Sequence, residues 1–112
     1  MAKLPNKVNI VGTDYTVQYC KSSSDVNVHK RESLWGEIDY WTTTIRVYKE
    51  RCTVELWKTI FHEILHGLAQ ELNLTMLKNK DNHDELDVLA SVLVDTLIRN
   101  GWFAVEEDGE TA

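Results

Sequence analysis

The chain has 112 residues, of which 43% are hydrophobic and 27% are charged, and it contains one proline and five glycines. This length and composition are typical of a single globular domain that can fold without a metal ion or a disulfide. The formal net charge of −6 argues against a nucleic-acid-binding protein, which would need clustered lysine and arginine.

The N-terminal stretch, MAKLPNKVNI, lacks the apolar core of a secretory signal peptide, and no apolar run is long enough to cross a membrane. We therefore expect a cytoplasmic protein with no membrane partner. The two cysteines, Cys20 and Cys52, have no CxxC spacing. We expect both to be free thiols, with a disulfide between them or a cysteine-containing metal site as the less favoured alternatives.

The first half of the chain predicts two β-hairpins joined by a polar loop. In KVNIVGTDYTVQYC, a GTD turn separates two β-branched or alternating runs, which predicts strands near residues 7–11 and 15–20. The segment KSSSDVNVHKRES is polar, as is typical of a loop. In LWGEIDYWTTTIRVYKE apolar and polar residues alternate again, which predicts strands near 34–40 and 43–49.

The second half of the chain predicts two helices. Apolar residues recur at helical spacing over residues 53–72, with Thr53 as the N-cap and Asn73 at the end of the pattern. A second helix is expected from His83 to about Arg99, where an Asn-Gly pair stops it. Its predicted buried stripe consists of Leu86, Leu89, Ala90, Leu93, Val94 and Leu97.

The order of these elements predicts the fold class. Strands followed by helices indicate an α+β fold, in which an antiparallel sheet of two hairpins packs on two helices. We expect a single domain over residues 1–103. Residues 104–112, which end in the small and acidic segment EEDGETA, are expected to form a disordered tail.

The stretch FHEILHG carries a candidate metal site. His62 and His66 are four residues apart, so a helix places both imidazoles on one face, where their neutral nitrogens can bind one zinc ion. Glu63 is rotated by about 100° from His62 and would lie beside the ion, where it can accept a proton from a water that the ion makes acidic. This is the physical basis of the HExxH motif of metallopeptidases.

The alternative is that the two histidines are chance residues on an ordinary amphipathic helix. Their position argues against core histidines, because both lie about 120–160° of helix rotation from the centre of the apolar stripe. They point instead toward whatever covers the other side of the helix. We therefore interpret His62 and His66 as metal ligands and Glu63 as the catalytic base.

With the HExxH motif, the strand pair GEIDY and IRV, and the sequence DVLA at residues 87–90, residues 34–100 resemble a small, phage-type zinc metallopeptidase. This minimal zincin is similar to the ImmA/IrrE-like and SprT-like groups. The resemblance implies a zincin-like fold, zinc as the cofactor and a regulatory role such as trimming a specific protein. It also implies that an extended peptide pairs with an edge strand, here residues 34–40 or 43–49.

A third zinc ligand must come from outside the motif, because a catalytic zinc usually has three protein ligands and one position for water. In the resembling groups this ligand is commonly a glutamate near the start of the following helix, and the register of DVLA places His83 there. His83 also lies on the predicted buried face of its helix, and Asp87, one turn later, could orient an imidazole. The alternatives are Glu85, which also fits a helix capping box, and then His29 from the polar loop.

The expected function is that of a zinc-dependent peptidase, in which the two motif histidines and His83 bind the metal and Glu63 is the general base. Its partner is a peptide or protein substrate. The alternative, from a different class, is a non-catalytic zinc-binding or protein-interaction module of the same fold. Tyr40 or Tyr48 could stabilise an oxyanion, although their spacing singles out neither.

Overall fold

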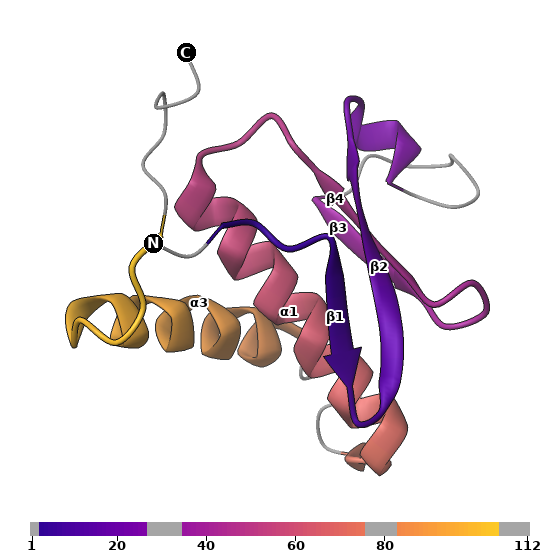
Figure 1. Ribbon diagram of the computed structural model, residues 1–112. Helices are drawn as coiled ribbons and strands as arrows, with labels where there is room; N and C mark the ends of the chain where they lie inside the picture. The colour runs from indigo at the N-terminus through magenta and orange to yellow at the C-terminus, as the bar shows by residue number, and fades with distance from the viewer. Residues whose placement is uncertain (1–2, 27–34, 76–82, 106–112) are drawn as a thin grey trace.

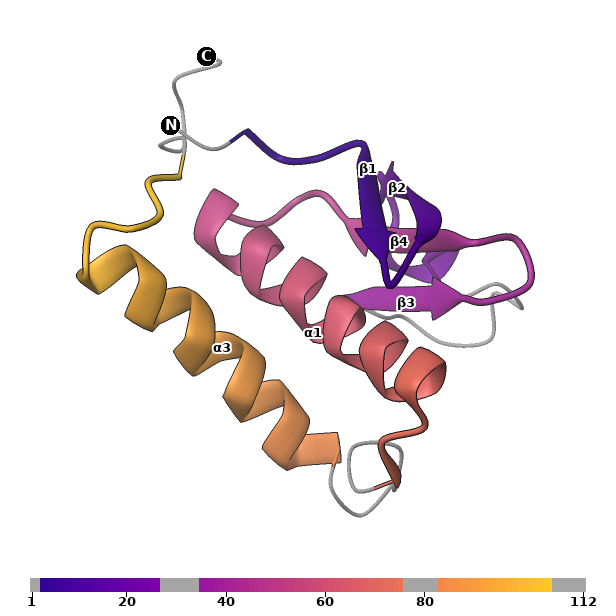
Figure 2. The ribbon, with the colours of Figure 1, turned by 60° about the horizontal axis from the view of Figure 1, so that its bottom comes forward.

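The structure is a computed structural model and describes residues 3–26, 35–75 and 83–105. In chain order its elements are β1 (Lys7–Ile10), β2 (Thr13–Cys20), the short 3-10 helix η1 (Ser23–Asp25), β3 (Gly36–Asp39), β4 (Thr44–Tyr48), α1 (Thr53–Leu72) and α3 (His83–Arg99). The four strands form one sheet, and α1 lies between this sheet and α3 (Figure 1 and Figure 2). The predicted α+β class is therefore confirmed.

The sheet is mixed and has the strand order β1-β2-β4-β3. The pairs β1–β2 and β3–β4 are antiparallel hairpins, as predicted, but β2 and β4 run parallel, with Thr16 opposite Thr44. The expectation of an entirely antiparallel sheet was wrong. Parallel neighbours require a long connection between them. After β2 the chain continues to β3, which is separated from β2 in the sheet by β4. The chain then returns as β4 between β2 and β3, so β4 runs in the same direction as β2.

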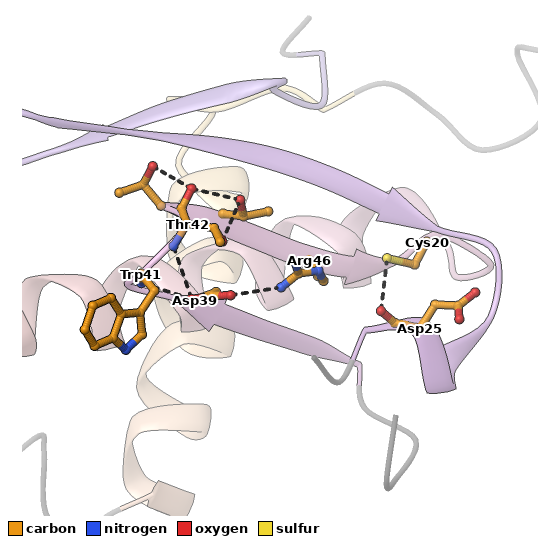
Figure 3. A network of polar contacts seen from close by, with 8 residues as sticks. Cys20, Asp25, Asp39, Trp41, Thr42 and Arg46 are labelled. Atoms are coloured by element: carbon orange, nitrogen blue, oxygen red, sulfur yellow. Dashed lines mark hydrogen bonds and ion pairs between the residues drawn. The ribbon is translucent and has the colours of Figure 1, made fainter. Parts of the chain in front are cut away.

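Polar contacts hold the β3–β4 hairpin at its turn (Figure 3). The Oδ1 atom of Asp39, the last residue of β3, accepts hydrogen bonds from the backbone N–H groups of Trp41 and Thr42, at 2.9 and 3.3 Å. The Oδ2 atom of Asp39 lies 3.5 Å from Nη1 of Arg46 on β4. These contacts stabilise the position of β3, whose open edge borders the candidate site described below.

Both long helices have the predicted bounds. The N-cap of α1 is Cys52, which makes no side-chain capping hydrogen bond, so the assignment of Thr53 as the N-cap was wrong by one residue. Asn73 ends α1 with a φ of 52°, and Gly101 follows α3 with a φ of 71°. Left-handed residues of this kind commonly end helices, because they turn the chain away from the helix axis.

The main core lies between the sheet and α1. Its buried residues are Ile10, Tyr15, Val17, Ile45, Val47, Leu56 and Ile60. Gly67 allows the helix to approach the sheet closely, because a Cβ atom at this position would lie 2.7 Å from Cδ1 of Ile10 and 3.2 Å from Cδ1 of Ile38. Removal of this apolar surface from water is the main contribution that stabilises the fold.

The helix α3 buries a narrower stripe than predicted. Leu86, Ala90 and Val94 are buried where α3 packs against α1. Leu89 and Leu93 are 48% and 37% exposed, so their assignment to the buried stripe was wrong. Within the described residues α3 packs chiefly against α1, and a helix with one neighbour covers only one stripe of its surface.

The remaining predictions concern the cysteines and the C-terminal end. Both cysteines are free thiols, as predicted, and Cys20 is buried whereas Cys52 is exposed. Phe103, the last residue of the predicted domain, packs edge-on against Trp57, with ring centroids 4.8 Å apart. Residues 106–112 of the predicted tail lie outside the described residues. Of the helices that the structure describes, none combines the length and the apolar character needed to cross a bilayer.

Candidate metal centre

The polar flank of α1, defined as Thr59, His62, Glu63 and His66, is the part of its surface next to β3 and α3. His62 and His66 are one helical turn apart, and their Nε2 atoms lie 3.0 Å from each other. Two bonds of about 2.0–2.1 Å from imidazole nitrogens to one zinc ion span a separation of this order. The structure therefore brings the two histidines together in an arrangement that fits a shared metal ion.

Glu63 is the buried carboxyl of the polar flank. Its exposed fraction is 4%, and within the described residues its Oε2 atom has no hydrogen-bond partner. Burial, and to a smaller extent the charge of Glu37, raise the pKa of Glu63 to about 8. A buried carboxyl oxygen without a hydrogen-bond partner is energetically costly. A cation or a water molecule beside Oε2 would remove this cost, so the orphaned oxygen fits a metal centre.

The three motif residues form one cluster of possible ligands. One nitrogen each of His62 and His66 and one oxygen of Glu63 all lie within 4.8 Å of one another. Asp87 of α3 extends the cluster, because its Oδ1 atom lies 3.0 Å from Nδ1 of His62. A hydrogen on Nδ1 that is donated to Asp87 leaves Nε2 of His62 unprotonated, which is the form that binds a metal. The sequence predicted that Asp87 could orient an imidazole, and in the structure the imidazole that Asp87 contacts is that of His62.

The structure describes only some of the residues that were predicted as candidates for the third zinc ligand. His83 is the first residue of α3, but its side chain lies outside the described residues, as does all of His29. Glu85 is described and exposed, and it borders an apolar hollow on the surface of α3. It does not line the pocket that contains His62. The structure therefore does not bring Glu85 to the histidines, and His83 stays the predicted third ligand.

His62 and Glu63 open into a pocket of about 390 Å³, which is within the usual size range of ligand sites. The pocket continues along α1 to Thr59, and its wall includes Trp35 and Arg51. Arg51 and Thr59 were not predicted from the sequence. A signal existed for Thr59, which lies four residues before Glu63 and therefore on the same side of the helix. Arg51 lies in the connection between β4 and α1, where no local pattern indicates what the side chain contacts.

The two tyrosines considered for oxyanion stabilisation are not among the described residues that line this pocket. The hydroxyl of Tyr40 donates a hydrogen bond of 3.2 Å to the backbone carbonyl oxygen of His66. Burial raises the pKa of Tyr40 to about 12. The ring of Tyr48 packs beside Trp35, with centroids 5.9 Å apart. Tyr40 therefore connects the end of β3 to α1, and the geometry does not support a catalytic role for either tyrosine.

Comparisons with protein-family models, with curated proteins and with solved structures find no match for this chain. A four-stranded mixed sheet with two helices defines the α+β class but does not by itself identify a zincin. The resemblance to zinc metallopeptidases therefore depends on the residues of the HExxH motif and on the geometry of the polar flank.

Proposed function

We propose that this protein is a zinc-dependent peptidase in which Glu63 is the general base. The observation that carries the proposal is the buried carboxyl of Glu63. Its Oε2 atom lacks a hydrogen-bond partner within the described residues, and one of its oxygens lies within 4.8 Å of a nitrogen of each paired imidazole. His62 and His66 would hold the zinc, with His83 as the third ligand. The bound zinc would supply a Lewis acid that lowers the pKa of a water molecule.

The protein residues perform the proton transfers in this proposal. Glu63 takes the proton from the attacking water and later delivers it to the nitrogen of the leaving amine. Its burial keeps bulk water away from the carboxyl. Asp87 holds the ring of His62 through Nδ1, which keeps the opposite nitrogen directed toward His66.

The open edge of β3 supports a peptide as the substrate. β3 is the last strand of the sheet and pairs only with β4 among the described strands, so its other edge can accept an extended chain. Gly36, its first residue, lies directly against the polar flank. A Cβ atom at Gly36 would lie 2.5 Å from Cγ2 of Thr59 and 3.5 Å from Cγ of Glu63. A peptide added at this edge would therefore pass the carboxyl that acts as the base.

Hydrolysis of unstructured peptides by the zinc-loaded protein tests the proposal. The wild type should bind one equivalent of zinc and cleave peptides, whereas Glu63→Gln should retain zinc and lose at least about 100-fold in rate. The matched control is Glu50→Gln, which removes the carboxylate of an exposed residue outside the pocket. Cleavage by Glu63→Gln at the wild-type rate would show that Glu63 is not the base, and a wild type without stoichiometric zinc would exclude the metal centre.

The outer face of α3 favours a second candidate function, a non-catalytic zinc-binding module that binds another protein. The exposed apolar side chains of this face are Val88, Leu89, Val92 and Leu93. Contiguous apolar surface of this kind commonly marks an interaction site. If this second function is correct, the wild type binds zinc but cleaves no peptide, and Glu63→Gln behaves like the wild type in the same assay.

A further inference from the structure

The wall of the pocket beyond Glu63 carries a guanidinium that is held in place on three sides. Nη1 of Arg51 donates a 3.0 Å hydrogen bond to Oγ1 of Thr59, and Nη2 donates a 2.9 Å hydrogen bond to Oε2 of Glu55. The guanidinium carbon lies 4.0 Å from the ring centroid of Trp35. Only 20% of the Arg51 side chain is exposed. A cation that is fixed before a ligand arrives loses little conformational entropy when it binds one.

This end of the pocket has more positive than negative charge. Nζ of Lys58 lies 3.8 Å from Oε1 of Glu55, so Lys58 and Arg51 share a single carboxylate. The guanidinium has five N–H groups, and its contacts with Thr59 and Glu55 use two of them within the described residues. Arg51 and Lys58 together carry one positive charge more than Glu55 neutralises, whereas Asp87 of the same pocket lies beside His62. This end of the pocket is therefore complementary to one further anion.

The position of this cationic end relative to Glu63 suits a neighbouring residue of a substrate. Thr59, which binds Arg51, precedes Glu63 by four residues, or about 6 Å along the helix axis. An extended peptide advances about 3.3 Å per residue. Because Gly36 of β3 lies against both Thr59 and Glu63, a peptide at the β3 edge would pass both. A residue one or two positions from the cleaved bond would therefore reach Arg51.

We propose that Arg51, with Lys58, is a specificity subsite for a carboxylate of the peptide substrate. The planar fork of an arginine matches the two oxygens of a carboxylate, which makes it more selective for this group than a lysine alone. The inference rests on the proposed peptidase function and adds a substrate class to it. The peptidase cuts beside an acidic residue, or beside a chain terminus that presents the same group.

The first experiment is cleavage of a randomised decapeptide library, acetylated and amidated at its ends, by the zinc-loaded wild type. Product sequencing by mass spectrometry should show Asp and Glu enriched about tenfold at one fixed position near the cut. A parallel library with free C-termini separates the two sources of carboxylate. Enrichment only in that library, at a fixed distance from the terminus, assigns the subsite to the terminal carboxylate. Cleavage without either preference overturns the subsite and leaves the peptidase function intact.

The second experiment assigns the preference to its residues, with a peptide pair that differs only by Glu or Gln at the selected position. Arg51→Gln should reduce the ratio of kcat/KM values for the pair from about ten to about one, and Lys58→Gln should reduce it partly. The control is Lys7→Gln, which removes an exposed lysine of β1 that pairs with Asp14 and should leave the ratio unchanged. An unchanged ratio in Arg51→Gln overturns the assignment.

Two further measurements keep the subsite testable if Arg51→Gln does not fold or if the wild type has no peptidase activity. If Arg51→Gln unfolds, as judged by circular dichroism, the assignment is decided by Arg51→Lys, which keeps the charge, together with Lys58→Gln. If the wild type cleaves nothing, the peptidase function fails. The subsite is then decided by the Kd values of the Glu and Gln peptides for zinc-loaded Glu63→Gln protein, measured by fluorescence anisotropy. Equal Kd values overturn it.

Discussion

The two sides of α1 serve opposite purposes. On the side of the sheet, Ile60 is fully buried and a Cβ atom at Gly67 would lie only 2.7 Å from Cδ1 of Ile10, so this surface is closely packed and stabilises the fold. On the polar flank, two imidazoles face one another, and the Oε2 atom of the buried Glu63 carboxyl has no hydrogen-bond partner among the described residues. A buried carboxyl oxygen without a partner reduces stability unless a ligand satisfies it. One helix therefore combines a rigid support with a reactive surface, as functional sites on stable scaffolds often do.

The largest expected effect on stability comes from the sheet side. Ile60→Ala removes a side chain with no exposed surface from the centre of the core. We expect the free energy of unfolding to fall by about 3–4 kcal/mol, because apolar burial is lost and a cavity remains. Urea denaturation measures this change. The comparison is Val92→Ala on the exposed face of α3, which should change stability by less than about 0.5 kcal/mol. Equal losses in both variants would contradict the assignment of the core.

The next largest effect is an increase in the free energy of unfolding, and it comes from a substitution on the polar flank. The pKa of Glu63 is raised from 4.5 to about 8 in the metal-free protein, first by burial and then by the charge of Glu37. A raised pKa means that the native state binds more protons than the unfolded state between these two values, so the stability contributed by neutral Glu63 is lost as the pH rises toward 8. Glu63→Gln cannot ionise and should be more stable than the wild type at pH 7 by about 3 kcal/mol.

Urea denaturation of chelator-treated wild type and Glu63→Gln from pH 4 to pH 9 measures this difference. The two proteins should converge near pH 4 and diverge as the pH increases. Parallel stability curves over the whole range would show that the carboxyl of Glu63 is not desolvated in the metal-free protein. Addition of zinc should reduce the difference, because a cation favours the ionised carboxylate.

The smallest expected effect concerns zinc affinity. Asp87→Asn replaces the carboxylate that contacts Nδ1 of His62. Loss of such an orienting partner typically reduces metal affinity by about 10-fold to 100-fold. Stability should change little, because the side chain of Asp87 is 71% exposed. Competition with a chelator measures the affinity, and Asp95→Asn, on the same helix but paired with Arg99, is the control. Equal zinc affinities in the two variants would exclude the orienting role.

Local features of the chain were predictable because they depend on neighbours in the sequence. The bounds of α1 and α3 follow from helical periodicity and from residues that readily adopt left-handed conformations, such as Asn73 and Gly101. The approach of His62 to His66 follows from helix geometry alone, since residues four apart share a face. Likewise, the two hairpins follow from alternation and turn residues.

Longer-range features were less predictable, because equivalent patterns fit several arrangements. Alternation shows which face of a strand is buried but not which strand lies beside it, so the parallel pairing of β2 with β4 was missed. The apolar residues of α3 form a wide stripe, and only its packing on α1 decides that Leu86 is buried whereas Leu89 is exposed. The proposed role of Arg51 depends on contacts with Thr59 and Trp35 that no local sequence pattern indicates, although its third partner, Glu55, is only four residues away.

The sequence by itself determined the α+β class, the two helices and the spacing of His62, Glu63 and His66, because each depends on short-range geometry. Only the tertiary structure decided that Glu63 is buried, that Asp87 contacts His62 and that Arg51 lines the same pocket. These properties arise where β3 and α3 meet α1, and burial and electrostatic interactions depend on what surrounds a group in space rather than on its neighbours along the chain.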